Sequence, residues 1–579
     1  MARGLRNSHG TRLVFGGGCV RRPQDALSRQ PMRCGSAASH LRGGVAVLLA
    51  FAVALQWMPV SRAEPLRTLE TPMRLVPIGP VETKVAGLHR FLGPLEIDAA
   101  SDGLVVVNRL PLERYLLGLN EVPPEWPRAA LQAQAIAART YALWTLGRPP
   151  AGSAEAYGFD ICASTDCQVF SGADLLEDPE GRRWFDAVAA TKGEVVIYGG
   201  EPILARYHSV SGGRTLDNSQ AYPDEGDFPY LKGVPSPSED ASPLDRWRVS
   251  FTLDDLRSLI SEAGWWNGSE LTEVHTIGSG SEQHYPDVVF EGPAERAVRD
   301  AQEVREVLGG LAARRFPARY PSLALMSSGR LPETFPSNRF EVSTESGAVR
   351  VDGRGWGHGV GMSQWGAHGL ALRGWGAKQI LEHYYTGARV SNVPGSQMLE
   401  VGVATGLDSV QATGAFRLED GDGRTVLPRA VGRWAISFEG SGVASLSPPP
   451  GFGRPLRLAV VSAPRTLRTG AKGTFALRLS APAEVRTSPG ATETFVASAG
   501  SNSFTWRAPD KPGRYRVEVA AVGSRGRETK VVEVEVVAPQ SSSPLPSPGG
   551  SQGVALIGVA LGLALMIIGG QALVKETRR

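Results

Sequence analysis

A glycine-rich stretch at residues 351–367, VDGRGWGHGVGMSQWGA, carries side chains that could bind a sugar. Its six glycines are interleaved with Trp356, His358, Gln364 and Trp365. Flat aromatic rings beside amide and imidazole groups suit sugar rings and their hydroxyls, and glycine lets a ligand approach the backbone closely. The alternative is a glycine-rich turn between two strands. The aromatic and polar side chains between the glycines favour a binding site.

Glu121 is the candidate for acid catalysis. It lies between the segment LERYLLGL and a pair of prolines, at a rigid corner of the chain. An acid catalyst needs a carboxyl group held in one place, with a pKa raised by partly apolar surroundings. Leu119, Val122 and Trp126 could supply those surroundings. The alternative is a glutamate that only interacts with the dipole of the helix that follows.

That helix is predicted to begin at Pro127 and to run to about Leu146, because proline suits a first helical turn. Its apolar stripe is Leu131, Ala135, Ala138 and Ala142, at steps of four, three and four. Arg139 falls on the same inward face, where a guanidinium is costly unless it is paired. We expect a carboxylate partner, either Glu121 or Glu125. The alternative is an arginine that reaches the surface at the edge of the stripe.

A second polar group follows the predicted hairpin that turns at Gly199-Gly200. His208, Ser211, Tyr230 and Lys232 are its candidates for a site. A Ser-His-Asp hydrolase is disfavoured because the chain has no G-x-S-x-G elbow around this serine. Residues three apart at a strand end also point to opposite faces.

Four cysteines occur, and Cys162 and Cys167 are the two outside the N-terminal region. Two cysteines this close in an oxidising compartment indicate a small disulfide loop. A zinc ion needs about four ligands, and no histidine lies within ten residues of the pair. We therefore expect a disulfide and no metal or other cofactor, with zinc as the alternative.

Length and composition indicate several domains and a chain rich in strands and loops. The chain has 579 residues, with 69 glycines and 42 prolines. Lys and Arg number 61 against 58 Asp and Glu, a net charge of +3, so charge alone indicates no nucleic-acid partner.

We expect an α+β chain that ends in an all-β domain and a membrane helix. Residues 86–393 mix strands and helices, residues 394–453 suggest a small β region, and residues 454–537 alternate as in an immunoglobulin-like or fibronectin-like sandwich. Nothing in the sandwich indicates catalysis.

Both ends of the chain carry targeting signals. Within residues 1–63, a basic flank, the apolar run at 45–55 and small residues before position 64 are typical of a signal peptide cleaved after Ala63, with an uncleaved anchor as the alternative. Residues 538–552 form a Ser/Pro linker, 553–574 an apolar span and 575–579 a basic tail. We expect an exported protein held by a C-terminal single-pass helix, with its bulk outside.

Three motifs in residues 86–393 together resemble the SpoIID/LytB family, which includes stage II sporulation protein D and amidase enhancers. The first is LPLERYLLGLNEVPPEWPRAALQAQAIAARTYAL, the second is YHSVSGGRT with PYLKGV, and the third is GRGWGHGVGMSQWGAHGLA with LEHYYTG. The resemblance implies a SpoIID-like domain there and does not cover the sandwich, the linker or the apolar span.

The resemblance implies a lytic transglycosylase that cleaves the bond between N-acetylmuramic acid and N-acetylglucosamine in peptidoglycan. Such enzymes prefer strands without stem peptides and leave a 1,6-anhydro end. The family's catalytic acid falls on Glu121. Residues expected to bind the substrate are Arg139, Ser211, Tyr230, Lys232, His358 and Gln364, and Ser363 lies in the same glycine-rich signature. Some members bind zinc near a cysteine pair that matches Cys162 and Cys167.

Two further readings remain open. In one, the protein is a non-catalytic wall-binding protein that enhances or localises an N-acetylmuramoyl-L-alanine amidase; Glu121 with Arg139 favours the enzyme over it. In the other, the sandwich and the anchor indicate an adhesin. The expected partners are peptidoglycan strands, a wall amidase and the membrane.

Overall fold

The structure is a computed structural model. It describes residues 67–538 except 80–82, 177, 279–284, 318, 321–324, 327–328, 331–334, 394, 396 and 490–493. The expected signal peptide, Ser/Pro linker, apolar span and basic tail lie almost wholly outside the described residues. The expectations about the signal peptide and the linker stay predictions.

Two expectations about fold class and localisation are corrected. The structure is 42% strand and only 21% helix, so β-sheet dominates well beyond the sandwich. A C-terminal membrane helix, and with it the single-pass anchor, is not supported: in the described part of the chain no helix has the length and apolar character to cross a membrane. The predicted span at 553–574 lies outside that part.

One large sheet of 11 strands combines strands from residues 67–111 with strands from residues 398–447. Its central order is β1-β24-β23-β22-β2-β5-β6-β21-β7, and β3 pairs with both β22 and β4. The strands are β1 (Arg67–Glu70), β2 (Met73–Pro77), β3 (Thr83–Val85), β4 (Arg90–Phe91), β5 (Leu95–Ala99), β6 (Leu104–Pro111), β7 (Ile161–Cys162), β21 (Met398–Leu407), β22 (Ser409–Glu419), β23 (Thr425–Gly440) and β24 (Val443–Ser447). The segment 394–453, separated on sequence grounds, thus shares a sheet with residues 67–111.

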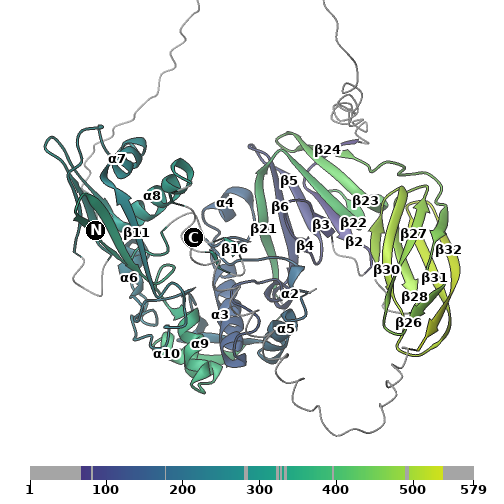
Figure 1. Ribbon diagram of the computed structural model, residues 1–579, viewed down its shortest axis with the longest axis horizontal. Helices are drawn as coiled ribbons and strands as arrows, with labels where there is room; N and C mark the ends of the chain where they lie inside the picture. The colour runs from purple at the N-terminus through teal and green to yellow at the C-terminus, as the bar shows by residue number, and fades with distance from the viewer. Residues whose placement is uncertain are drawn as a thin grey trace, which may run out of the picture. The chain divides into compact units, whose positions relative to one another are not determined.

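A layer of helices follows β6 and surrounds α3 (Arg128–Leu146). Figure 1 shows α3 beside α9 and α10. Helix α3 begins directly after Pro127 and ends at Leu146, close to the bounds expected from the sequence, and Gly147 is its C-cap. Ala135 and Ala138 pack into the core under the large sheet, whereas Ile136 packs into a second core on the opposite side. The small side chains of α3 allow this burial on two faces. The helices of this layer are α2 (Leu112–Leu117), α3, α5 (Gly181–Ala190), α9 (Gln364–Leu372) and α10 (Ala377–Tyr384).

Short strands and turns tie the glycine-rich stretch to the hairpin segment. Strand β10 (Tyr207–His208) pairs in parallel with β19 (Met362–Ser363). A three-stranded sheet of β20 (Arg389–Asn392), β8 (Glu194–Tyr198) and β9 (Glu201–Pro202) lies next to α3 and α10. The remaining short elements here are α4 (Ser153–Tyr157), η1 (Asp174–Leu176), α6 (Asn218–Ala221) and η2 (Pro223–Glu225).

Residues 246–354 build a further core around Trp265, Trp266 and Phe290. Two three-stranded sheets, β11-β18-β17 and β12-β13-β14, pack with α7 and α8. The elements are β11 (Arg246–Thr252), α7 (Leu253–Glu262), β12 (Glu273–Ile277), β13 (Asp287–Glu291), β14 (Arg296–Asp300), α8 (Ala301–Arg315), β15 (Leu325–Met326), β16 (Gly329–Arg330), β17 (Phe340–Glu345) and β18 (Ala348–Arg354).

Residues 458–537 form two sheets that enclose one core, which includes Phe475, Trp506 and Val519. The sheet orders are β25-β27-β30 and β26-β32-β31-β28-β29. The strands are β25 (Leu458–Ser462), β26 (Thr466–Arg468), β27 (Lys472–Leu479), β28 (Ala483–Ser488), β29 (Phe495–Ala497), β30 (Gly500–Arg507), β31 (Gly513–Gly523) and β32 (Arg527–Val537). Burial alternates along β27 and along the second half of β30, as the sequence pattern there predicted.

Candidate functional site

Glu121 lies where the chain after α2 runs beside residues 168–170. Leu119 pairs with Phe170 as an antiparallel bridge, and the Asn120 N–H donates to the Val169 carbonyl at 2.9 Å. The Val169 N–H in turn donates to Oε1 of Glu121 at 2.7 Å. The carboxyl group is therefore held by backbone, and Glu121 remains partly exposed.

A chain of buried hydrogen bonds orients the second donor to Glu121. The Tyr207 hydroxyl donates to the same Oε1 at 2.9 Å. Nε2 of Gln168 donates to the Tyr207 hydroxyl at 2.8 Å, and Oε1 of Gln168 accepts from the Tyr115 hydroxyl at 2.9 Å. Because Gln168 is fully buried and bonded at both ends, it fixes which way the Tyr207 hydroxyl points.

The glycine-rich stretch supplies the third donor. Ser363 caps α9 by accepting from the Gly366 N–H at 3.1 Å, so the helix begins at Gln364. The Gln364 side chain hydrogen-bonds Glu121 and lies 3.5 Å from Oε1 of Gln134 on α3. Gln364 thus connects the stretch at 351–367 to the acid, as a site residue.

Burial raises the pKa of Glu121 from 4.5 to about 7. The hydrogen bonds from Val169, Tyr207 and Gln364 act in the opposite direction, since they stabilise the carboxylate, but they offset only part of the burial. All three donors are neutral. A carboxyl group with this pKa is partly protonated near neutral pH and can act as an acid and then as a base.

Three aromatic rings cluster at the start of α9, where Trp365 directly follows Gln364. The ring centroids of Trp126 and Trp365 lie 5.0 Å apart, and that of His368 lies 4.8 Å from Trp126 and 5.4 Å from Trp365. Trp126 is largely buried, while Trp365 and His368 keep part of their surface exposed. Indole rings at a partly open site suit the apolar face of a sugar.

His358 supports Tyr207 and does not reach the acid directly. Its Nε2–H donates to the Tyr207 carbonyl at 2.9 Å, and its Nδ1 accepts from the Val360 N–H at 3.1 Å. Burial holds the pKa of His358 well below its ordinary value, so the ring is neutral. The ring positions the residue whose hydroxyl contacts Glu121.

Comparison with known proteins finds sequence similarity to one family. The family described as SpoIID, stage II sporulation protein, matches residues 100–198. Stage II sporulation protein D of Bacillus amyloliquefaciens is 28% identical over 320 residues, 54% of this chain and 83% of its own length. Its Bacillus subtilis counterpart is 28% identical over 294 residues, 49% of this chain and 76% of its own. The amidase enhancer of Bacillus subtilis is 24% identical over 298 residues, 47% of this chain and 39% of its own.

Residues 100–198 thus resemble the SpoIID family, and about half of the chain is similar to relatives named stage II sporulation protein D and amidase enhancer. The matched segment of the family covers Glu121, α3 and the cysteine pair. It does not reach the two-sheet sandwich.

Arg139, which the family resemblance assigned to substrate binding, lies in a closed pair. Its Nε and Nη2 donate to both oxygens of Glu113 at 2.8 and 2.9 Å. Its remaining donors reach the carbonyls of Glu194 and Val188, and the side chain is 1% exposed. The expectation that Glu121 or Glu125 would pair with Arg139 is wrong. Glu113 lies in the first turn of α2, and α2 packs directly on α3.

Ser211 belongs to a buried cluster around Glu239, and 1% of its surface is exposed. Glu239 accepts from the Ser211 N–H and hydroxyl, the Gly213 N–H at 2.8 Å, the Ser236 hydroxyl at 2.8 Å and the Ser363 hydroxyl. Burial raises the pKa of Glu239, but these donors outweigh it and leave the pKa below its ordinary value. The cluster fastens Ser363, and therefore α9, to the hairpin segment.

Tyr230 and Lys232 also make their contacts away from Glu121. The Tyr230 hydroxyl accepts from the Leu204 N–H at 3.2 Å, and the residue is 8% exposed. Lys232 bridges Asp217, at 3.3 Å, and Asp227. These contacts are structural in this conformation, and a substrate role for the two residues stays a prediction.

The glycines at 351–367 let this stretch pack closely against another segment of the backbone. Gly355 and Gly361 both have positive φ, and a Cβ on Gly361 would lie 2.1 Å from the Arg206 carbonyl oxygen. A Cβ on Gly355 would lie 2.5 Å from the Val210 carbonyl oxygen. These glycines let the stretch lie against residues 206–212 and so bring His358 to Tyr207.

Cys162 and Cys167 are joined as a disulfide. Bonded sulfurs offer no thiolate ligands, so the pair does not fit a zinc ion in this form. The disulfide closes the loop that directly precedes Gln168 and Val169. Gln168 orients the Tyr207 hydroxyl, and the Val169 N–H donates to Glu121.

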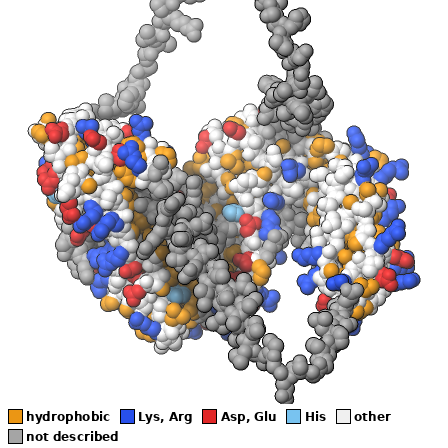
Figure 2. Space-filling model, in the orientation of Figure 1, with side chains coloured by type: hydrophobic (Ala, Val, Ile, Leu, Met, Phe, Trp, Pro, Cys, Tyr) orange, Lys and Arg blue, Asp and Glu red, His pale blue; other side chains and the backbone are white. Residues whose placement is uncertain are grey.

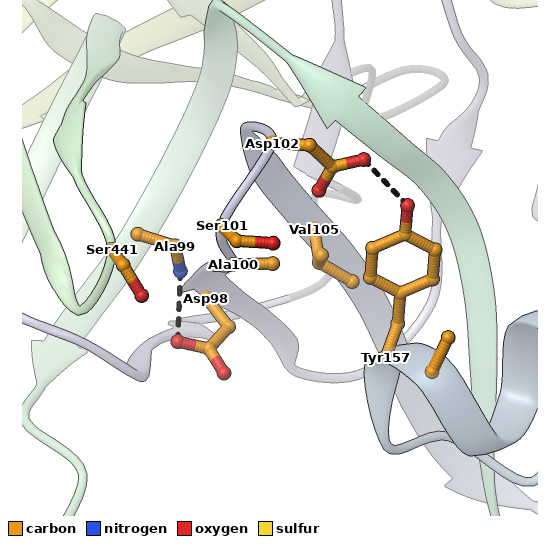
Figure 3. A pocket seen from close by; sticks show the side chains of 9 residues that line it. Asp98, Ala99, Ala100, Ser101, Asp102, Val105, Tyr157 and Ser441 are labelled. Carbon is orange, nitrogen blue, oxygen red and sulfur yellow. Dashed lines mark hydrogen bonds between the residues drawn. The ribbon is translucent and has the colours of Figure 1, made fainter. Parts of the chain in front are cut away.

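Sequence reasoning missed Tyr207 and Gln168. Both carried a weak signal: Tyr207 opens the YHSVSGG motif, and Gln168 directly follows Cys167. A cavity of about 570 Å³ lies elsewhere, between β5, β6 and α4. Figure 3 shows Tyr157 and Asp102 on its wall, joined by a hydrogen bond of 2.6 Å. No residue of the Glu121 site lines it.

Proposed function

We propose that this protein is a peptidoglycan lytic transglycosylase with Glu121 as its general acid and base. The substrate is a glycan strand of alternating N-acetylmuramic acid and N-acetylglucosamine, without stem peptides. The bond cleaved joins the anomeric carbon of N-acetylmuramic acid to the next sugar.

The observation that carries this proposal is one carboxyl group with a raised pKa among neutral donors. Hydrolytic glycosidases use two carboxylates on opposite sides of the bond. The groups bonded to Glu121 in the described residues are Val169, Tyr207 and Gln364, none of them a carboxylate. A single acid suffices when the nucleophile is a hydroxyl of the sugar itself.

The reaction conserves its protons. Protonated Glu121 donates to the glycosidic oxygen as the bond from that oxygen to the anomeric carbon breaks. The C6 hydroxyl of the muramyl residue attacks the same carbon, and the carboxylate of Glu121 takes its proton. The products are a 1,6-anhydromuramyl end and a new N-acetylglucosamine end, and no water is consumed.

Arg139 does not oppose this chemistry. A guanidinium next to Glu121 would stabilise the carboxylate and lower its pKa. Arg139 pairs with Glu113 instead, and the groups that lower the pKa of Glu121 are the neutral donors Val169, Tyr207 and Gln364. Trp365 and His368, which follow Gln364 on α9, offer a partly exposed aromatic surface for a sugar.

The test is incubation of the purified protein with glycan strands lacking stem peptides, followed by mass spectrometry. We expect 1,6-anhydromuramyl products from the natural protein and a loss of about 10²–10⁴-fold in Glu121→Gln. Glu125→Gln is the matched control, because Glu125 is exposed and lies four residues away. Equal activity in Glu121→Gln and the natural protein would overturn the assignment.

A second function is supported by the similarity to the Bacillus subtilis amidase enhancer. In this alternative the protein binds the wall and stimulates an N-acetylmuramoyl-L-alanine amidase without cutting glycan itself. A second assay separates the two: such an amidase is added together with the protein to peptidoglycan that keeps its stem peptides. Faster peptide release, no anhydro products and no effect of Glu121→Gln would select the enhancer.

A further inference from the structure

The sandwich and the rest of the described chain differ sharply in charge. Residues 454–537 contain 14 Lys and Arg against 7 Asp and Glu, whereas residues 63–453 contain 35 against 49. The net charge of the whole chain is therefore near neutral although the sandwich is basic and residues 63–453 are acidic. In Figure 2 the sandwich carries many blue Lys and Arg side chains and few red acidic ones.

Within the sandwich the two sheets divide the charges unequally. Strands β25, β27 and β30 read LAVVS, KGTFALRL and GSNSFTWR and contain no Asp or Glu. The strands of the other sheet contain glutamates at 484, 518, 528, 533 and 535. Of the two sheets, only β25-β27-β30 thus carries cations without any acidic residue in its own strands.

The outer face of β25-β27-β30 forms a surface that we name the basic face. Phe475, Leu477, Phe504 and Trp506 point into the core, so the alternate residues point outward. The basic face consists of Arg457, Lys472, Thr474, Arg478, Ser501, Ser503, Thr505 and Arg507, all of them exposed.

The cations of the basic face occur in two pairs. Lys472 and Arg507 stand directly opposite each other across β27 and β30. At the other end, Arg457 directly precedes Leu458, which pairs with Leu479 across β25 and β27. Arg478 directly precedes Leu479, so Arg457 and Arg478 lie near each other. Six residues of strand separate Lys472 from Arg478, about 20 Å. Hydroxyl groups fill the space between the two pairs.

These cations have no carboxylate partner in the described part of the sandwich. The ion pairs that the sandwich forms there involve Glu484 or Glu518 on the other sheet. Like charges directly opposite each other destabilise a sheet. On the other sheet, by contrast, Arg514 and Arg516 stand opposite Glu535 and Glu533. The basic face therefore keeps a repulsive arrangement that an external anion would relieve.

We propose that the basic face is a binding site for a flexible phosphodiester polymer. Guanidinium groups match phosphate oxygens with two parallel hydrogen bonds, and the serine and threonine hydroxyls can bond polyol or phosphate groups between them. Two cation pairs about 20 Å apart require a chain with repeated charges and not a single ion. The surface accepts such a chain without a preformed groove.

The chemistry of the face favours phosphodiester-linked polyols over nucleic acid. Proteins that bind single strands use exposed aromatic side chains on which bases stack. The basic face has none, since its aromatic residues Phe475, Phe504 and Trp506 lie in the core. The inference does not depend on the transglycosylase proposal, because no residue of the Glu121 site takes part.

The test measures binding of fluorescent poly(glycerol phosphate) of about 20 units to the purified full chain by anisotropy at several salt concentrations. We expect the triple variant Lys472→Gln, Arg478→Gln, Arg507→Gln to lose at least about tenfold in affinity near 0.05 M salt. The slope of log affinity against log salt should fall by about 2. The matched control is Arg514→Gln, Arg516→Gln, Arg527→Gln on the other sheet, which removes the same charge and should stay within about twofold.

Several outcomes would overturn the proposal. Equal losses in both triple variants would mean that net charge alone attracts the polymer. Tighter binding of polyglutamate or of an oligothymidylate would exclude phosphodiester-linked polyols as the preferred class. Self-association of the chain that only the basic-face variant abolishes, without a change in polymer binding, would assign the face to a second copy. The single variant Lys472→Gln should have a melting temperature no lower than that of the natural protein. That result would show that the fold tolerates the change.

Discussion

Glu121 and Glu239 are two carboxyl groups that burial affects in the same direction but whose pKa values end on opposite sides of the ordinary value. Burial raises the pKa of both. Around Glu121 the donors are Val169, Tyr207 and Gln364, and the pKa stays near 7. Around Glu239 five donors converge, three hydroxyls and two backbone N–H groups, and the pKa falls below its ordinary value.

The difference teaches that the number of donors, and not burial alone, separates a reactive carboxyl group from a structural one. A fully satisfied carboxylate such as Glu239 is fixed in its charged form and binds segments of chain together. An incompletely satisfied one such as Glu121 keeps both protonation states accessible. Three experiments would sharpen or break this comparison.

The largest effect is expected for Glu239→Gln. In the variant, an amide NH2 group would replace one carboxylate oxygen and would face donors such as the Gly213 N–H. Two donors cannot bond each other, so these buried N–H and hydroxyl groups would lose their acceptor. We expect a decrease in the free energy of unfolding of about 3 kcal/mol. Chemical denaturation measures it, with the neighbouring exposed Asp240→Asn as control. A change as small as that of Asp240→Asn would show that the serine cluster does not depend on the charge.

A smaller effect of opposite sign is expected for Glu121→Gln. Because the folded pKa of about 7 exceeds the ordinary 4.5, the folded protein holds its proton more tightly, and stability falls as pH rises from 4.5 to 7. The amide removes this penalty and can still accept from Val169 and Tyr207, which both bond Oε1. We expect the variant to be more stable by about 2 kcal/mol at pH 8, since partial exposure screens part of the charge, and unchanged at pH 4. A difference that does not vary with pH would contradict the raised pKa.

The smallest effect is expected for Tyr207→Phe. Loss of a donor to the carboxylate raises the pKa of Glu121 further, so the alkaline limb of the cleavage rate should move to higher pH. The unfolding free energy should fall by only about 1 kcal/mol. Tyr384→Phe is the matched control, because the Tyr384 hydroxyl bonds Ser236 beside Glu239. A shift of the pH profile in Tyr384→Phe but not in Tyr207→Phe would reverse the assignment of the two regions.

Local patterns predicted the elements but not all of their contacts. The start of α3 after Pro127 and the inward face of Arg139 follow from spacing, and the structure confirms both. The partner of Arg139 does not follow, because Glu121 and Glu113 are both close in sequence and only the packing of α2 on α3 selects Glu113. Likewise, no local pattern separates Ser211, which bonds Glu239, from a substrate-binding serine.

The sequence by itself determined the motifs, the identity of the acid candidate and the alternation of the sandwich strands, because these depend on residue type and short-range spacing. Only the tertiary structure decided that Gln168, Val169, Tyr207 and Gln364 surround Glu121. Those residues come from segments 47 to 243 positions further along the chain. Hydrogen-bond geometry and burial at a site depend on which segments pack together, and a pKa is set by that packing.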